Sequence, residues 1–452
     1  MTGDLLWPGL HRAGDLFGDM AVVAAMVEVE VGWSAALERA GLAPAGSSAA
    51  VGKVVLAPDD LAALVEEAEA SGNPLIPLLG QVRAQVRTEL PDAAAAVHRG
   101  LTSQDVVDTA LVRCAQACLE ALAADLDHLV ASTAALADRH RQTLMAARTL
   151  GQHALPSTFG ARAAGWRQGL AAARDQVTRC LARLPVQAGG AAGTMAATVE
   201  VCRAAGSADP VAAAEALVRD LAQALGLQAA APWPTARFPV TTVGDALVTA
   251  SDALGHLAND VVLQSRPEIG ELSEPAGRGR GVSSAMPQKR NPVLSVLIRR
   301  HAMSAPLLAA QLHIASAGAV DERPDGAWHL EWTALRDLSR RTVAAARQAV
   351  ELVDGIEVHV ETMRANLDAA LPGILAERLV PALADALPGG RAQATDLLAT
   401  SENVDDLVLR VTSADGARLT ADEVRALADP TAYLGWADRL VDLAILPETS
   451  GK

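Results

Sequence analysis

The amino-acid sequence predicts an all-α protein built around a bundle of long helices, and three observations support this prediction. Ala, Leu and Val are abundant, whereas Phe, Tyr and Trp together make up only 2% of the 452 residues, so an aromatic-rich sheet is not indicated. The stretch 101–150 contains neither Gly nor Pro, which predicts a helix far longer than average. Charged residues recur along the apolar stretches, which is typical of a soluble bundle and not of a membrane span.

We predict a first helical domain over residues 1–100. Asp19 is a favourable N-cap for a helix that ends at the glycine at position 41. A Pro-Asp-Asp sequence starts a second helix over 58–71, and an Asn-Pro pair starts a third over 74–90. These elements together have the size of a small domain.

The central domain is predicted over residues 101–354, with a catalytic loop at 271–291. Thr102 and Asp105 resemble a capping box at the start of a helix that runs to about residue 142. Gly and Pro then divide the chain into further helices over 158–184, 210–226, 240–265, 292–317 (with a kink at Pro306) and 327–354, and a small-residue turn at 189–194.

After residue 355 the predicted helices shorten, because Pro and Gly become frequent, and residues 355–452 are assigned to a third helical domain. The long central helices carry more apolar surface than one bundle usually buries. We therefore expect the chain to form an oligomer.

Charge and composition exclude several classes of protein. The net charge of −15 argues against a nucleic-acid partner, because neutralising phosphates requires clustered Lys and Arg. The four cysteines lack the spacing of a metal site, and the alternating glycines of the loop lack the GxGxxG spacing of a dinucleotide site, so neither a metal nor another cofactor is predicted. No leader peptide is recognisable and no apolar run approaches the roughly 20 residues of a membrane span, so we expect a soluble, cytoplasmic protein without a membrane partner.

The loop GRGRGVSSAMPQKRNP, at 277–292, differs most from its helical surroundings. Asn291 is a favourable N-cap and Pro292 suits the first helical position, so the loop is expected to end at a helix N-terminus that attracts an anion. Lys289 adds a positive charge, and Ser283 and Ser284 add two hydroxyl groups. These groups predict a site for a carboxylate, although composition alone favours a plain Gly/Ser linker.

Polar groups also gather at two other breaks between helices. A helix N-terminus can bind an anion, so the residues before the long helix are candidate ligands: His98, Arg99, Thr102, Ser103 and Gln104. The break after that helix carries a second set: Arg148, Gln152 and His153. The segments 233–237 and 321–326 also concentrate polar groups at helix breaks, but both fit ordinary polar loops equally well and are given low weight.

Four motifs occur in the order GLTSQDVVDTA, RTLGQHALPSTFG, GGAAGT and GVSSAMPQKRNP. Together they resemble the fumarase/aspartase superfamily, whose signature GSSxMPxKxNP is similar to the loop. Within it the chain is most similar to the 3-carboxy-cis,cis-muconate cycloisomerases, through TSQD, RTLGQHALP, GAWHLEW at 326–332 and ADPTAYLG at 428–435. Adenylosuccinate lyases share GLTS and VVDTA but have a catalytic His in place of Leu150.

The resemblance implies a homotetramer with a twenty-helix core, whose active sites each combine segments of three subunits. It implies a small di- or tricarboxylate substrate and acid/base chemistry at a carbon next to a carboxylate, through an aci-carboxylate intermediate. Ser283 would be the general acid/base, with Lys289 and Asn291 holding the carboxylate. The substrate-binding residues would be His98, Arg99, Thr102, Ser103, Gln104, Arg148, Gln152, His153, Ser284 and Met286.

Three positions depart from the cycloisomerase pattern. Val282 stands where a Gly usually precedes the serine pair, Pro234 replaces the His of W-H-T-x-R, and Asp321 replaces the His of H-E-R. The leading interpretation is a cycloisomerase. The alternative is a β-eliminating lyase that releases fumarate from a substituted succinate, such as nitrosuccinate lyase, and an adenylosuccinate-type lyase or an inactive scaffold is less favoured.

Overall fold

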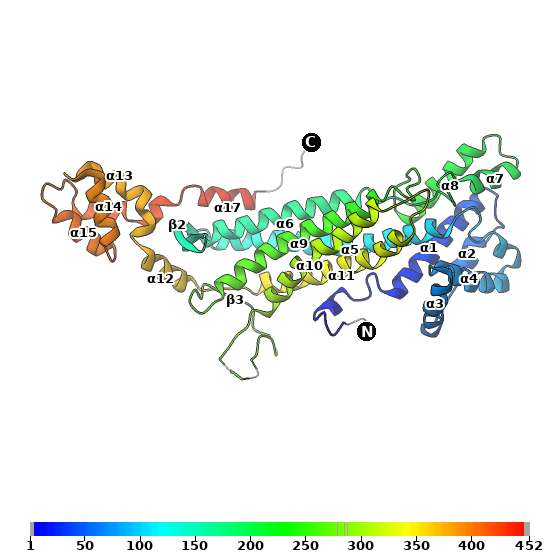
Figure 1. Ribbon diagram of the computed structural model, residues 1–452, viewed down its shortest axis with the longest axis horizontal. Coiled ribbons are helices and arrows are strands. Elements are labelled where there is room, and N and C mark those ends of the chain that lie inside the picture. Colours follow the sequence, from blue (N-terminus) through cyan, green and yellow to red (C-terminus); the bar gives the residue numbers. More distant parts are fainter. Residues whose placement is uncertain (1–3, 278, 284, 287, 447–452) are drawn as a thin grey trace. The chain divides into compact units, whose positions relative to one another are not determined.

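The structure is a computed structural model that describes residues 4–277, 279–283, 285–286 and 288–446. Within these residues helices dominate and four short strands occur, so the predicted all-α class is confirmed (Figure 1). The N-terminal helices lie close to their predicted positions: α1 (Asp19–Arg39), α2 (Ser47–Gly52), α3 (Pro58–Ser71) and α4 (Leu75–Glu89). The N-cap of α1 is Gly18, so Asp19 lies in the first turn and does not cap the helix as predicted.

Five long helices form the centre of the chain: α5 (Ser103–Arg139), α6 (Phe159–Leu181), α9 (Phe238–Gln264), α10 (Val293–Ala317) and α11 (Gly326–Asp354). Small residues let these helices approach closely. A Cβ added at Gly244 in α9 would lie 2.8 Å from Leu312 Cδ1 in α10, so a larger residue there would force the helices apart. The shorter helices α7 (Ala196–Ala204) and α8 (Pro210–Leu225) follow α6, and the Asp209 side chain caps α8 close to the predicted helix start.

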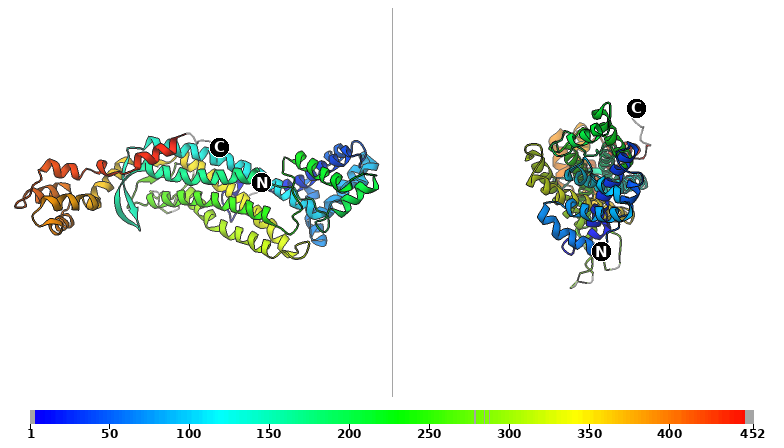
Figure 2. Two further views of the ribbon diagram at one scale, coloured as in Figure 1. Left: turned by 90° about the horizontal axis from the view of Figure 1, so that it is seen from above. Right: turned by 90° about the vertical axis from the view of Figure 1, so that its right-hand side faces the viewer.

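The chain divides into two compact units, one of residues 1–125, 173–252 and 300–347, the other of residues 126–172, 253–299 and 348–452. Within each unit, segments of the five long helices lie side by side (Figures 1 and 2). In the first unit α1 packs against α8, and Trp33 is fully buried. The division into three domains that the sequence suggests stays a prediction.

A β-hairpin interrupts the predicted helical sequence after α5. Strands β1 (Leu144–Thr149) and β2 (Gln152–Thr158) pair antiparallel, and the hairpin arrow is visible in Figure 2. Leu150 and Gly151 form the turn with φ values of 51° and 79°, which are the left-handed angles that a two-residue hairpin turn requires. The prediction that the first long helix extends to about residue 142 was therefore wrong by about a turn.

The C-terminal part consists of short helices, as predicted. Strand β3 (Leu272–Ser273) pairs with β4 (Glu357–Val358). The helices that follow are α12 (Val360–Ala370), α13 (Ala376–Ala386), α14 (Gly390–Thr400), α15 (Val404–Thr412), α16 (Ala421–Leu427) and α17 (Ala437–Ile445). Leu375, Leu383, Leu407 and Val411 are buried in their common core, to which β1 contributes Ala146.

Two helices of the described chain, α1 and α10, are long and apolar enough to cross a bilayer by length and composition alone, contrary to the prediction. The core helix of a soluble protein passes the same test, and 56% of the apolar window of α1 is buried inside the protein. These helices are therefore weak evidence for a membrane span.

Candidate active site

The segment 98–104, which leads into the first turn of α5, is held by side chains from neighbouring helices of the first unit. Trp33 Nε1 donates a hydrogen bond to the carbonyl oxygen of Arg99 at 2.8 Å, and Thr198 Oγ1 donates to the carbonyl oxygen of Gly100 at 2.9 Å. A Cβ at Gly100 would lie 2.8 Å from Thr198 Oγ1, and the φ of Gly100 is +88°, so only glycine fits. The backbone of this segment is thus preorganised.

The two basic residues of the segment are both engaged. His98 adopts a φ of +65°, and its Nδ1 lies 2.7 Å from Glu30 Oε1. Arg99 Nη1 donates to the carbonyl oxygen of Leu42 at 3.1 Å. Glu30 was not among the predicted site residues.

Arg323 links the loop 321–326 to the predicted site. Its Nη2 lies 3.1 Å from both Thr102 Oγ1 and Ser103 Oγ, to which it donates hydrogen bonds. Gln104 Nε2 donates to the carbonyl oxygen of Pro234 at 2.8 Å. The structure therefore brings residues of the loops 233–237 and 321–326 to the start of α5, and a role for these loops in the site stays a prediction of low weight.

Asp105 fixes the first turn of α5. Its buried carboxylate accepts hydrogen bonds from the backbone N–H groups of Thr102 (2.9 Å), Gly189 (2.8 Å) and Gly190 (3.0 Å), and the first of these confirms half of the predicted capping box. Burial raises the pKa of Asp105 to about 6, although the three N–H donors oppose this shift. The carboxylate thus connects the turn at 189–194 to the site.

A buried cluster lies one turn further along α5. Arg237 donates to Asp108 Oδ2 at 2.7 Å and to Glu331 Oε2 at 2.6 Å, and each of these three side chains is at most 2% exposed. Burial opposes the charge of Arg237, but the two carboxylates more than compensate and raise its pKa. Trp328 Nε1 also donates to Asp108 Oδ1 at 2.7 Å, so the cluster ties α5 and α11 to the residue directly before α9.

The second predicted segment forms the tip of the β1–β2 hairpin in the second unit. Gln152 and His153 are exposed there, and Leu150 is fully exposed. Arg148 instead forms a bidentate ion pair with Glu271, at 2.9 and 2.7 Å. The structure therefore gives Arg148 a protein partner, so its guanidinium is not a free carboxylate-binding group.

The predicted catalytic loop, also in the second unit, is closed by a narrow neck. Gly281 O accepts hydrogen bonds from Asn291 N (3.0 Å) and Asn291 Nδ2 (3.2 Å), and Val282 forms an antiparallel bridge with Arg290. Val282 is accommodated there because its side chain is 59% exposed. Beyond the neck, Ser283 Oγ accepts from Met286 N at 3.2 Å, and Lys289 is exposed. Ser284 lies outside the described residues.

The cap of α10 differs from the prediction. Asn291 directs its amide to Gly281, while Glu274 accepts hydrogen bonds from the backbone N–H groups of Leu294 (2.9 Å) and Ser295 (2.6 Å). A carboxylate satisfies two N–H donors at once and also carries the charge that a helix N-terminus favours. The predicted anion site at this helix end is therefore occupied by the protein's own Glu274.

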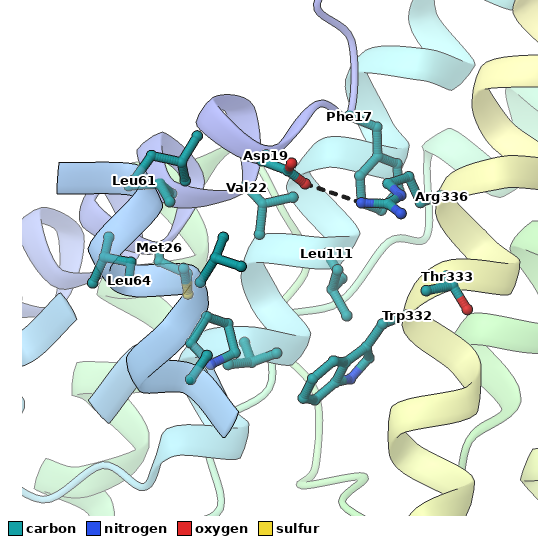
Figure 3. Close-up of a pocket in the computed structure, with 15 residues that line it drawn as sticks. Phe17, Asp19, Val22, Met26, Leu61, Leu64, Leu111, Trp332, Thr333 and Arg336 are labelled. Carbon is teal, nitrogen blue, oxygen red and sulfur yellow. Dashed lines mark hydrogen bonds and ion pairs between the residues drawn. The ribbon is translucent and has the colours of Figure 1, made fainter. Parts of the chain in front are cut away.

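A separate pocket of about 270 Å³ lies in the first unit (Figure 3). Its lining is mostly apolar and includes Met26, Leu64 and Trp332. Asp19 and Arg336 are the charged groups among the described lining residues, and they pair with each other at 3.0 Å. None of the predicted site residues lines this pocket, so it does not contain the groups that a carboxylate substrate requires.

Comparisons with known proteins place the chain in a family. A family model described as a lyase matches residues 24–306. The chain is 42% identical to a nitrosuccinate lyase from Streptomyces davaonensis, over 94% of this chain and 90% of that protein. It is 38% identical to a 3-carboxy-cis,cis-muconate cycloisomerase from Bradyrhizobium diazoefficiens, over 94% and 93%. The crystal structure of 3-carboxy-cis,cis-muconate lactonizing enzyme from Pseudomonas putida matches with a TM-score of 0.84 and 31% identity, over 96% of this chain and 95% of that one.

The long-helix fold and the signature loop define an enzyme of the lyase and cycloisomerase class. The chain belongs to the lyase family of the fumarase/aspartase superfamily, as its motifs predict. Members of this superfamily act on small carboxylates and are typically oligomeric, and this membership supports a soluble protein. The expected similarity to muconate cycloisomerases is confirmed, and so is the alternative similarity to a nitrosuccinate lyase.

Proposed function

We propose that this enzyme acts as a 3-carboxy-cis,cis-muconate cycloisomerase in the cytoplasm, with Ser283 as the general acid/base and no metal or cofactor. The observation that carries the proposal is the closed neck between Gly281 and Asn291, which keeps Ser283 and Lys289 on one short loop. Similarity to the cycloisomerases over nearly the whole chain supports the substrate class.

The proposed step is a proton transfer next to a carboxylate. In lactonisation a substrate carboxylate oxygen adds to a double bond, and the Ser283 hydroxyl then gives its proton to the carbon of the resulting aci-carboxylate. A serine alkoxide needs nearby N–H groups and cations to be stable, and Met286 N and Lys289 supply them on the same loop. Asn291 and Lys289 would hold the carboxylate whose charge increases.

We propose that the remaining predicted residues bind the other carboxylates of the substrate. The proposed binding role of Thr102 and Ser103 is supported by their contact with the Arg323 guanidinium, which adds a cation to that segment. His98, Arg99, Gln104, Gln152, His153, Ser284 and Met286 complete the proposed set. For Arg148 we propose an indirect role, in which it holds the hairpin that carries Gln152 and His153.

A second candidate function is β-elimination from a substituted succinate. Ser283 would then remove a proton next to a carboxylate, and the leaving group, nitrite in the case of nitrosuccinate, would depart with its bonding electrons to give fumarate. The 42% identical relative favours this reaction. Pro234 and Asp321 also favour it, because they remove two potential cations from a site that would otherwise bind a tricarboxylate.

We also propose a homotetramer in which three subunits contribute to each active site. One face of α10 supports this assembly: Val296, Met303, Leu307 and Ile314, spaced at helical intervals, are 49–75% exposed. Light scattering should give the mass of four chains, and Leu307→Asp should yield a smaller, inactive species. A fully active single chain would contradict the shared sites.

Incubation of the purified enzyme with 3-carboxy-cis,cis-muconate and, separately, with nitrosuccinate distinguishes the two reactions by ultraviolet absorbance. Turnover of the muconate alone supports lactonisation, and turnover of nitrosuccinate alone supports elimination. Ser283→Ala should lower kcat about 10²- to 10⁴-fold without changing the free energy of unfolding. The exposed Ser413→Ala is the matched control. Full activity of Ser283→Ala would overturn the mechanism.

A further inference from the structure

Glu30 is a buried carboxylate on the face of α1 that meets the site segment. Its side chain is 1% exposed, and its Oε1 lies 2.7 Å from His98 Nδ1. Among the described residues its Oε2 has no hydrogen-bond partner. One turn further on, Trp33 of the same helix holds the carbonyl oxygen of Arg99. Helix α1 therefore holds two consecutive residues of the segment.

Two features of the Glu30–His98 pair are energetically unfavourable: the burial of the Glu30 carboxylate and the backbone conformation of His98. Burial of a carboxylate costs roughly several kcal/mol of hydration free energy, and this cost remains unless a partner offsets it. His98 has a φ of +65°, a left-handed conformation that costs roughly 1–2 kcal/mol for a residue with a side chain. Strained residues that are held by buried polar partners are enriched at functional sites.

The hydrogen bond to Glu30 also decides which atom of the imidazole is available. A carboxylate accepts, so Nδ1 carries the hydrogen that it donates to Glu30. The second nitrogen, Nε2, is then left to contact a ligand, as in other histidines that a carboxylate orients. A carboxylate ligand only accepts hydrogen bonds, so Nε2 must also carry a hydrogen to bind one, which requires the imidazolium form of His98. Thr102, Ser103 and Arg323 lie on or against the same preorganised segment.

We infer that Glu30 is a positioning residue, which orients the imidazolium of His98 so that its Nε2–H donates a hydrogen bond to a carboxylate of the substrate. This inference rests on the proposed function, because it takes a small di- or tricarboxylate as the ligand. Glu30 itself does not touch the substrate. It acts on binding through the ring of His98.

The test compares substitutions at two glutamates of α1. Glu30→Ala removes the acceptor, whereas Glu30→Gln keeps an oxygen that can accept from Nδ1–H. Glu28→Gln is the matched control, since Glu28 lies two residues earlier, is 44% exposed and pairs with Arg113. For the substrate that the parent enzyme turns over, Glu30→Ala should raise KM about 10- to 100-fold with a much smaller change in kcat. Glu30→Gln should fall between Glu30→Ala and the parent, and Glu28→Gln should equal the parent.

Nuclear magnetic resonance of the imidazole nitrogens provides a readout that needs no turnover. Addition of fumarate, a simple dicarboxylate, should shift the Nε2 signal of His98 in the parent, and this signal is assigned by its loss in His98→Gln. The shift should require about 10-fold more fumarate in Glu30→Ala. If Glu30→Ala does not fold, Glu30→Gln is titrated in its place and should need more fumarate than Glu28→Gln.

Two results would overturn the inference: no response of His98 to fumarate, or equal fumarate affinity in the parent and the folded Glu30 variant. A lower free energy of unfolding with unchanged KM would likewise leave Glu30 as a purely structural residue. Failure of the parent to turn over either substrate would instead refute the proposed function, and the fumarate titration would still test the Glu30–His98 pair.

Discussion

Arg148 and Glu271 form a bidentate ion pair in which Nη1 lies 2.9 Å from Oε2 and Nη2 lies 2.7 Å from Oε1. The Glu271 side chain is completely buried, and Asn366 Nδ2 donates a further hydrogen bond to it at 2.9 Å. Because Arg148 belongs to β1 and Glu271 directly precedes β3, this pair ties the exposed hairpin to the start of the predicted catalytic loop at 271–291.

Replacing Arg148 by Ala would leave the Glu271 carboxylate buried without its cation, so we expect the free energy of unfolding to fall by about 3–5 kcal/mol. Urea denaturation measures this change. Arg148→Lys keeps the charge but not the two parallel hydrogen bonds, and should lie in between. The control Arg39→Ala removes the exposed pair with Asp220 and should cost less than about 1 kcal/mol. Unchanged stability of Arg148→Ala would show that its guanidinium is not needed by Glu271.

Arg237 has a stronger structural role, because it compensates two buried carboxylates. We expect Arg237→Met to lower the free energy of unfolding by at least about 3–5 kcal/mol and to lower kcat/KM, because Asp108 also orients Trp328. Adding Asp108→Asn and Glu331→Gln should restore part of the stability, since it removes the uncompensated charges. A triple variant less stable than Arg237→Met would contradict this electrostatic account.

His301 makes the stability of the fold depend on pH. Its Nε2 lies 2.9 Å from Ser251 Oγ and 3.1 Å from Thr342 Oγ1 in the core. Burial, with smaller contributions from Arg341 and Arg300, lowers the pKa of His301 from 6.5 to about 3. Between these two pH values the unfolded chain binds a proton that the folded protein does not bind.

The contribution of His301 to the free energy of unfolding is therefore complete above about pH 6.5 and is lost as the pH falls towards about 3. Its full size is on the order of 5 kcal/mol. Urea denaturation from pH 7 to pH 4 should show a flatter pH dependence for His301→Gln than for the parent. Parallel curves would assign the acid sensitivity to other groups.

Arg323 is expected to act on substrate binding more than on stability. Its guanidinium is only half-buried and contacts the Thr102 and Ser103 hydroxyls, so Arg323→Gln should raise KM about 10-fold and leave the melting temperature within a few degrees. Steady-state kinetics and thermal denaturation separate the two effects. Arg425→Gln, at an exposed pair with Asp405, is the control. An unchanged KM for Arg323→Gln would exclude Arg323 from the binding site.

Local signals in the sequence predicted most helix positions correctly. Asp209 caps α8, and α3 spans the predicted 58–71. Helix starts and ends depend on hydrogen bonds within a few residues, so neighbouring residues are sufficient to place them. The special position of Glu30 could also have been recognised in the sequence. Glu30 shares a helical face with Met26, Trp33 and Leu37, and a charged residue is unusual on such an apolar face.

Other features were missed because a distant group competes with the local one. Asn291 is a favourable N-cap, yet the cap of α10 comes from Glu274, about twenty positions upstream along the loop. The hairpin at 144–158 was missed because Leu is uncommon at a left-handed turn position, where Asn, Asp or Gly is expected. In both cases contacts that form only in the folded chain override the local preference.

The sequence by itself determined the helical class and the loop that places the enzyme in its superfamily, because helical periodicity and a long motif are written in consecutive residues. The tertiary structure alone decided which charged groups are free and which are paired. It pairs Arg148 with Glu271, His98 with Glu30, and Arg323 with Thr102 and Ser103. These partners are 68 or more positions apart, so only packing brings their atoms within hydrogen-bonding distance.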